Sequence, residues 1–112
     1  MKKNGLHVDT DGTKCWYKDG LIHREDGPAI IYKDGAQYWY KNGKYHRDDG
    51  PAAICRDGSQ YWLKNGKYHR DDGPAIIYPN GKHSWYKDDI MYIPTAHEIM
   101  TWKMNEKSTA HW

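Results

Sequence analysis

Residues 39–61 decide the fold, with the sequence WYKNGKYHRDDGPAAICRDGSQY. Closely similar stretches occupy residues 16–38 before it and residues 62–84 after it. The copies begin at tryptophans spaced 23 residues apart: Trp16, Trp39, Trp62 and Trp85. Self-similarity at a fixed period is typical of repeat architectures, in which each unit covers the apolar surface of its neighbour. The chain is therefore expected to be an array of similar units.

Each unit contains two Asn-Gly or Asp-Gly dipeptides between apolar-rich arms, such as Asn42-Gly43 and Asp34-Gly35. Both central residues of a type I′ turn need a positive φ, which these dipeptides adopt at low cost. Two-residue turns of this type would place Tyr40 opposite Tyr45, and Ile31 opposite Tyr38. The sequence therefore predicts two tight antiparallel hairpins in each unit.

Alternation along the strands then assigns the side chains to two faces. The packed face is expected to hold Ala29, Ile31, Tyr38, Tyr40 and Tyr45. The other, half-exposed face is expected to hold Ile30, Tyr32, Gln37, Trp39, Lys41, Lys44 and His46.

The expected fold is all-β: a single-layer antiparallel β-hairpin solenoid over residues 1–93, followed by a C-terminal cap and tail over residues 94–112. The array comprises a partial unit (5–15), three full units (16–38, 39–61 and 62–84) and a degenerate unit (85–93). Thr95 and Glu98 form a capping-box pattern that predicts a short helix over residues 96–106. Its helically spaced residues, Ala96, Ile99, Met100, Lys103 and Met104, lie beside Trp102, and residues 107–112 are expected to be loose.

Composition narrows the classes of protein. The net charge is +2, which argues against strong nonspecific binding to nucleic acid. Two cysteines are too few for a small disulfide scaffold, and the sequence lacks a secretory signal and a membrane-spanning apolar run. A cytoplasmic protein without membrane insertion is expected. Six Trp, ten Tyr and no Phe indicate that amphipathic rings supply most of the buried area.

The units resemble MORN-type repeats, which share the 23-residue period and the hairpin. The match is closer to a variant class with a W-Y-x-N-G-x-x-H-R-x-D-G-P-A core, found here at residues 16–29, 39–52 and 62–75. Similar units occur in bacterial proteins labelled YwqK-type antitoxins and in proteins of bacteriophages and giant viruses. The resemblance covers residues 5–93 and implies a binding or scaffolding repeat, with a location in the host cytoplasm if the chain is phage-encoded.

His23, His46 and His69 each precede an arginine and acidic residues, a combination that also serves general-base and metal chemistry. Because these groups recur with the whole unit, a structural role is favoured, with Arg47 pairing to an acidic residue of a neighbouring unit. His97-Glu98 lacks the second histidine of a zinc helix. Cys15 and Cys55 stand where sister units carry Tyr, which indicates buried spacer thiols. No catalytic residue, metal site or cofactor is predicted, and the chain is not expected to be an enzyme.

The favoured function is noncatalytic binding of a protein partner, as a scaffold or an antitoxin-like inhibitor, because repeat arrays present long surfaces and interfaces are rich in Trp, Tyr and Arg. The positions that differ between units, Thr13, Ala36, Ser59 and Lys82 among them, are further partner candidates. The candidate partner surface comprises Leu21, Ile22, Tyr32, Gln37, Trp39, Lys44, His46, Gln60, Trp62, Lys67, His69 and Tyr78.

Three alternatives stay open. The first is stacking of a nucleotide or similar ring on the Trp/Tyr face, and the second is a His/Asp metal-dependent enzyme. Nucleic acid is a weaker candidate, because the Asp pairs would interrupt a basic track. A homodimer through exposed strand edges is compatible with any of these functions.

Overall fold

The computed structural model describes residues 2–109 of the chain, with side chains through residue 106. As expected, it consists mostly of β-strands in antiparallel hairpin sheets with one C-terminal helix. The elements are β1 (Gly5–Val8), β2 (Lys14–Lys18), β3 (Leu21–Ile22), β4 (Ile30–Ile31), β5 (Gln37–Tyr38), β6 (Tyr40–Lys41), β7 (Lys44–Tyr45), β8 (Ala53–Ile54), β9 (Gln60–Tyr61), β10 (Leu63–Lys64), β11 (Lys67–Tyr68), β12 (Ile76–Ile77), β13 (His83–Ser84), β14 (Tyr86–Lys87), β15 (Ile90–Met91) and α1 (Ala96–Thr109).

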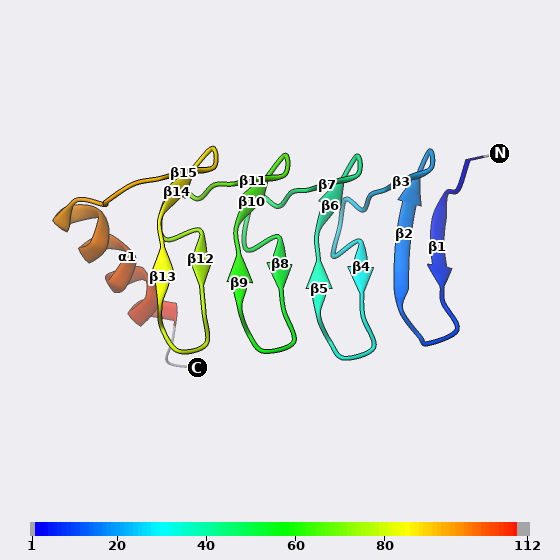
Figure 1. Cartoon of the computed structure of the whole chain (residues 1–112), viewed down its shortest axis with the longest axis horizontal. Helices are drawn as coiled ribbons and strands as arrows, with labels where there is room; N and C mark the ends of the chain where they lie inside the picture. Colours follow the sequence, from blue (N-terminus) through cyan, green and yellow to red (C-terminus); the bar gives the residue numbers. More distant parts are fainter. Residues whose placement is uncertain (1, 110–112) are drawn as a thin grey trace.

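The main sheet has the strand order β1-β2-β4-β5-β8-β9-β12-β13, with β3 beside β2. Three small hairpins, β6–β7, β10–β11 and β14–β15, continue the chain from β5, β9 and β13. Figure 1 shows the hairpins standing side by side in a row, with α1 at the C-terminal end. The principal extents are 52 × 28 × 20 Å, and the radius of gyration of 15.6 Å exceeds the ~13 Å expected for a compact domain of this length. The molecule is therefore elongated and thin.

The same backbone hydrogen bonds join successive hairpins. The Trp39 amide donates to the Ala52 carbonyl (2.7 Å), and the amides of Trp16 and Trp62 make the corresponding bonds to Ala29 and Ala75. All three of these alanines are completely buried. A small side chain at this position suits the close packing of neighbouring strands, and the bonds tie each hairpin to the next.

The predicted turn at Asn42-Gly43 is confirmed. Both residues have positive φ angles, 51° and 79°, and Tyr40 lies opposite Tyr45. The Asn42 amide donates to Nδ1 of His23 (2.9 Å), so a side chain from the preceding hairpin also fixes the turn.

The predicted register at Asp34-Gly35 is wrong by one residue. Within the described loop of residues 33–35, positive φ is confined to Gly35 (95°), and the Tyr32 amide donates to the Ala36 carbonyl across three residues. The carboxylate of Asp34 accepts a hydrogen bond from the Ala36 amide (3.0 Å), as in a type I turn followed by a left-handed glycine. Ile30, not Ile31, consequently lies opposite Tyr38.

This shift exchanges residues between the two faces, because side chains alternate along a strand. Ile30 and Tyr32 lie on the same face as Tyr38, and the rings of Tyr32 and Tyr38 make an edge contact at 5.5 Å. Ile31 lies opposite Gln37 on the other face. The expected grouping of Ile31 with Tyr38, and of Tyr32 with Trp39, is therefore wrong.

The predicted capping box of the helix is confirmed. The Glu98 amide donates to Oγ1 of Thr95 (3.1 Å), and the Thr95 amide donates to the Glu98 carboxylate (2.9 Å). Helix α1 extends to Thr109, three residues beyond the expected end, because no glycine or proline follows residue 106 to stop it. Residues 107–109, expected to be loose, are therefore helical, and residues 110–112 lie outside the described part.

Trp102 provides the ring contacts of α1 with the sheet. Its ring lies 5.9 Å from that of Trp85, at an interplanar angle of 85°, and 4.8 Å from the His83 ring. Trp85 is only 5% exposed, whereas Met100 and Met104 are more than 60% exposed. The ring contacts between the helix and the last hairpin are thus made by Trp102, whereas Met100 and Met104 are exposed. Within the described residues, no helix combines the length and apolar character needed to cross a bilayer.

Trp102→Ala should release α1 from the sheet and expose Trp85. Because Trp102 is half-buried, the free energy of unfolding in urea should fall by about 1–3 kcal/mol, below the cost of removing a fully buried tryptophan. The fluorescence of Trp85 should shift to the red. Met104→Ala, at an exposed position of the same helix, should change stability by less than about 0.5 kcal/mol. Equal effects of the two substitutions would contradict this role of Trp102.

Candidate functional site

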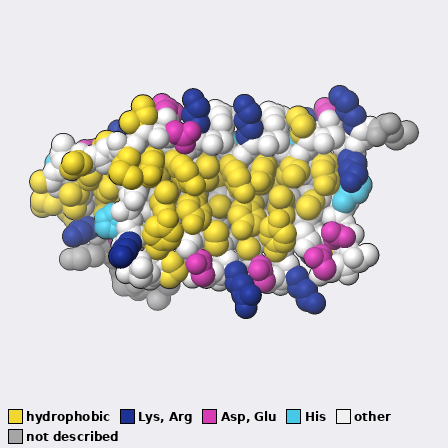
Figure 2. All heavy atoms as spheres, viewed as in Figure 1, with side chains coloured by type: hydrophobic (Ala, Val, Ile, Leu, Met, Phe, Trp, Pro, Cys, Tyr) yellow, Lys and Arg dark blue, Asp and Glu magenta, His cyan; other side chains and the backbone are white. Residues whose placement is uncertain are grey.

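The sheet has two chemically different faces. Strand register and ring contacts place the tyrosines on one of them, here called the tyrosine face. Its residues are Cys15, Tyr17, Ile22, Ile30, Tyr32, Tyr38, Tyr40, Tyr45, Ala53, Cys55, Tyr61, Leu63, Tyr68, Ile76, Tyr78 and Tyr86. Figure 2 shows a continuous field of hydrophobic side chains across the face turned to the viewer, with charged side chains along its upper and lower edges.

The tyrosine rings contact one another along this face while their outer sides stay open. Tyr40 packs on Tyr45 at 4.4 Å, and Tyr61 lies 6.2 Å from Tyr68. Tyr32 and Tyr78 are 43% and 40% exposed. Tyrosine suits such half-covered positions, because its hydroxyl can reach water while its ring packs, whereas phenylalanine lacks this polar group.

Burial among these rings changes the acidity of the hydroxyls. Desolvation, assisted by the neighbouring Cys55, raises the pKa of Tyr38 to about 12. Desolvation also raises the pKa of Tyr40, with a further contribution from its hydrogen bond to Tyr45. Both hydroxyls are therefore neutral at physiological pH.

The opposite, tryptophan face is defined by Trp16, Gln37, Trp39, Lys41, His46, Gln60, Trp62, Lys64, His69 and Trp85. On this face an arginine covers each of the first three tryptophans. The Arg47 guanidinium lies 3.9 Å from the ring centroid of Trp39, donates from Nε to Asp49 (3.0 Å) and donates from Nη1 to the Pro51 carbonyl (3.1 Å). Arg24 and Arg70 make the corresponding contacts.

This arginine geometry corrects the expectation that Arg47 pairs with an acidic residue of a neighbouring unit. The close approach depends on Gly50, because a Cβ there would lie 2.8 Å from Cζ of Arg47. The short Asp48-Asp49-Gly50-Pro51 segment therefore wraps around the guanidinium of its own unit. The pKa of Asp49 is lowered, chiefly by its hydrogen bond from Arg47. Arg47 is thus a clamp within its own unit.

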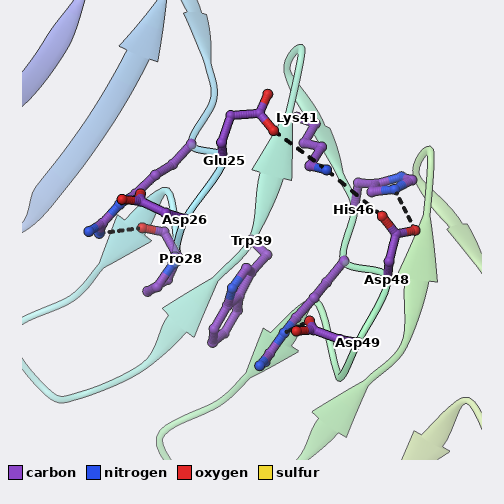
Figure 3. Close-up of a pocket in the computed structure, with 11 residues that line it drawn as sticks. Glu25, Asp26, Pro28, Trp39, Lys41, His46, Asp48 and Asp49 are labelled. Atoms are coloured by element: carbon purple, nitrogen blue, oxygen red, sulfur yellow. Dashed lines mark hydrogen bonds and ion pairs between the residues drawn. The ribbon is translucent and has the colours of Figure 1, made fainter.

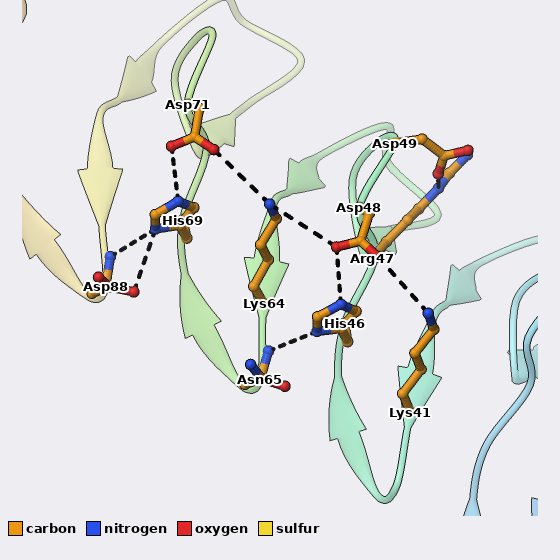
Figure 4. Close-up of polar contacts among 10 residues, drawn as sticks. All are labelled: Lys41, His46, Arg47, Asp48, Asp49, Lys64, Asn65, His69, Asp71 and Asp88. Atoms are coloured by element: carbon orange, nitrogen blue, oxygen red, sulfur yellow. Dashed lines mark hydrogen bonds and ion pairs between the residues drawn. The ribbon is translucent and has the colours of Figure 1, made fainter.

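The repeated histidines connect neighbouring hairpins, as Figure 4 shows for His46 and His69. Nδ1 of His46 accepts the Asn65 amide (3.1 Å), which requires this nitrogen to be unprotonated, so Nε2 carries the hydrogen that is donated to Asp48 (3.0 Å). His23 and His69 make the same pair of contacts. Lys64 lies between Asp48 (4.0 Å) and Asp71 (3.9 Å) and extends the network from one hairpin to the next.

These hydrogen bonds bear on metal binding and on acid–base catalysis by the histidines. Both ring nitrogens of each repeated histidine are occupied by contacts within the protein, so a metal ion would have to displace one of them. Among the described residues, no group of three or more His, Cys, Asp or Glu side chains is arranged to hold a metal ion. The geometry of the three histidines is that of a structural link between hairpins.

Two similar grooves lie on the tryptophan face between neighbouring hairpins, with volumes of about 590 and 720 Å³. Figure 3 shows the first, with Trp39 between the Asp26–Pro28 segment and the Asp48–Asp49 segment. Its charged lining comprises the cations Arg24, Lys41 and Arg47 and the carboxylates Glu25, Asp26, Asp48 and Asp49. The cations are already paired, Lys41 with Glu25 (3.7 Å) and Asp48 (3.8 Å) for example. The grooves therefore present exposed carboxylates beside a tryptophan ring.

The structure divides the predicted partner surface between these two faces and the hairpin tips. The first groove contains Trp39 and His46, the second contains Gln60, Trp62 and His69, and Gln37 lies on the same face. Ile22, Tyr32 and Tyr78 lie on the tyrosine face, whereas Leu21, Lys44 and Lys67 lie at the tips. The residues that sequence reasoning left out are the other tyrosines, which it took for core. The sequence signal that could have identified them is the high number of tyrosines relative to aliphatic residues.

Three of the further partner candidates are buried: Thr13, Ala36 and Ser59 are only 3–7% exposed. Each follows the glycine of the three-residue turn, and its amide donates to an aspartate carboxylate, as the Ser59 amide does to Asp57 (2.8 Å). Lys82 at the equivalent position is exposed. Cys15 and Cys55, expected to be buried, are half-buried free thiols on the tyrosine face, and burial raises the pKa of Cys15.

Comparison with known proteins gave no match for the chain among protein-family models, curated proteins or solved structures. The functional argument therefore depends on the geometry of the two faces.

His46→Ala should weaken the link between neighbouring hairpins. It removes the acceptor for the Asn65 amide and the donor to Asp48, so the free energy of unfolding should fall by about 1–2 kcal/mol in urea titrations. The matched control is His97→Ala, at an exposed position on α1, which should be close to neutral. A loss for His46→Ala no larger than that for the control would show that the imidazole is dispensable.

The tyrosine face should lose stability at alkaline pH. The folded-state pKa of Tyr38 is raised to about 12, above the ~10 of an unfolded tyrosine, so its contribution is fully present below pH ~10 and is lost as the pH rises toward 12. Tyrosinate absorbance should show one group of hydroxyls titrating near pH 10 and a later group that titrates together with unfolding. A single titration near pH 10 with the fold intact would contradict this picture.

Proposed function

We propose that the chain is a MORN-like β-hairpin solenoid that acts without catalysis, by binding a protein partner through its tyrosine face. Its role would be that of a scaffold or of an antitoxin-like inhibitor, and its place of action the cytoplasm. The identification as a solenoid is supported by the inter-hairpin hydrogen bonds that recur every 23 residues and by the elongated shape. The inhibitory role is suggested by the sequence resemblance.

One observation supports binding above all: a continuous field of hydrophobic side chains covers one side of the molecule, and Tyr32 and Tyr78 of the tyrosine face are exposed. Continuous apolar patches of this kind mark interaction surfaces in soluble proteins. Tyrosine is also enriched at protein interfaces, because a rigid ring contributes contact area at little cost in conformational entropy and the hydroxyl supplies a hydrogen bond. The rows of charged side chains at the two edges resemble the polar rim of an interface.

The tryptophan face is a weaker candidate for nucleotide stacking. A phosphate entering the first groove would meet four carboxylates, while the three cations there are already paired with acidic groups of the protein. Arg47 also covers one side of the Trp39 ring, which leaves less of it for a base. The charges of this face thus oppose phosphate-bearing ligands, and the tyrosine face carries the proposal.

The test is capture of a partner from a lysate of the source cells, with tagged wild-type protein and the double variant Tyr32→Thr/Tyr78→Thr. Both tyrosines are exposed, so the variant should fold, and threonine is compatible with a strand. A protein captured in a saturable manner by the wild type should be lost by about tenfold or more in the double variant.

The matched control is Ile90→Thr, at an exposed hairpin-tip position that is outside the predicted partner surface and away from the tyrosine face, and it should retain the partner. Absence of a saturable partner at near-physiological salt would overturn the proposed function. Equal capture by wild type and double variant would place the interface elsewhere.

A further inference from the structure

A hollow of about 370 Å³ lies near the middle of the tyrosine face. Ala53, Leu63 and Ile76, all less than 9% exposed, form the buried part of its lining. The remaining lining residues are Tyr38, Tyr45, Cys55, Tyr61, Tyr68 and Tyr78. None of the nine lining residues is Asp, Glu, Lys, Arg or His, so the hollow is suited to a neutral group.

The hollow coincides with three departures of this chain from its own repeat. Ala53 stands where the neighbouring units carry Ile30 and Ile76, and Cys55 stands where they carry Tyr32 and Tyr78. Leu63 stands where the other hairpins carry Tyr17, Tyr40 and Tyr86. Each departure replaces a larger side chain by a smaller one, and all three line the same hollow.

The ring contacts of two neighbouring hairpins show where side-chain volume is reduced at the hollow. In the hairpin before the hollow, Tyr45 packs on Tyr40 across the strand pair at 4.4 Å. In the hairpin at the hollow, the residue opposite Tyr68 is Leu63, so the ring that would fill the corresponding place is missing. Because this face is open, the side chains around the space lack the dispersion contacts that a packed neighbour would supply. Three coincident reductions therefore indicate a place that something else fills.

We propose that this hollow receives one bulky apolar side chain of the protein partner and is the anchor point of the tyrosine face. The proposal rests on the proposed function, since it assigns a specific contact within that interface. A protein is the expected source, because a small molecule filling the hollow would leave the surrounding tyrosines open. A side chain that projects from a protein surface would fill the hollow, and the rest of that surface would cover the tyrosines. Anchor side chains in central pockets, ringed by aromatic residues, supply most of the binding free energy of many interfaces.

The chain itself provides the substitutions that test the proposal. Ala53→Ile, Cys55→Tyr and Leu63→Tyr restore the residues that the sister units already carry, so each should fill the hollow without disturbing the fold. The triple variant should be at least as stable as the wild type in urea and should bind the captured partner about tenfold or more weakly. The control is a substitution on the other face, Ile54→Val, which leaves the hollow unchanged and should retain binding.

Two outcomes separate this proposal from the proposed function. If Tyr32→Thr/Tyr78→Thr loses the partner but the stable triple variant binds as the wild type does, the hollow is not an anchor, although the tyrosine face still binds. If wild-type protein captures no partner, the proposed function fails, and a second measurement then decides whether the hollow accepts apolar groups.

That measurement uses Cys55, which lines the hollow, and two symmetric probes, bis(phenethyl) disulfide and bis(hydroxyethyl) disulfide. The Cys55 thiolate attacks one sulfur of the probe, a mixed disulfide forms, and the other half leaves as a thiolate. The phenethyl group should accumulate on Cys55 at least about fivefold over the hydroxyethyl group at equilibrium, as expected when apolar area is buried. Peptide mapping by mass spectrometry gives both yields.

Cys15 is the internal control, since it is also half-buried on the tyrosine face but lies outside the hollow. The preference for the phenethyl group should be confined to Cys55 and should disappear in Ala53→Ile/Leu63→Tyr, which leaves the thiol in place. The same preference at both cysteines, or a preference unchanged in the filled variant, would overturn the proposal.

Discussion

The hydrogen bonds that each hairpin makes with the next are the interactions on which the rest of the structure depends. Most strands are only two residues long, so a hairpin is stable only where a neighbour satisfies its backbone. Two bonds satisfy the backbone in this way. The Trp39 amide donates to the Ala52 carbonyl at the middle of the hairpin, and the Asn65 amide donates to the imidazole of His46 at its tip. The arginine clamp then holds the connecting segment in place. Both faces are consequences of this backbone arrangement.

The two ends of the array show how much each hairpin needs a neighbour. At the beginning, Oδ1 of Asn4 accepts the Asp19 amide (3.0 Å) where later turns bond to an imidazole. At the other end, Ile93 stands at the position of the clamping arginines and is 95% exposed. There Trp102 of α1 contacts Trp85 instead. Different side chains thus replace the missing contacts at each end.

The period, the hairpins, the first turn and the capping box were predictable from sequence, because each follows from local residue chemistry. The register at Asp34 was not, since the same Asp-Gly dipeptide fits both a two-residue and a three-residue turn. The two turns differ in their backbone hydrogen bonds. In the two-residue turn the Asn42 amide donates to the imidazole of His23, whereas in the three-residue turn the Tyr32 amide donates to the Ala36 carbonyl across the loop. One residue of register moved Tyr32 and Tyr78 to the tyrosine face and so divided the candidate surface. The hollow could be seen only after Ala53, Cys55 and Leu63 were brought together in space.

The recurrence of the same bonds between the inner hairpins has a consequence for how such a chain can change its length. Inserting or deleting a whole 23-residue unit between the two ends would join hairpins whose donors and acceptors already match. The area of the tyrosine face is therefore adjustable in steps of one unit, by duplication within the gene, without redesign of a core. Local features such as the hollow can then arise by a few substitutions within a single copy, while the other copies preserve the fold.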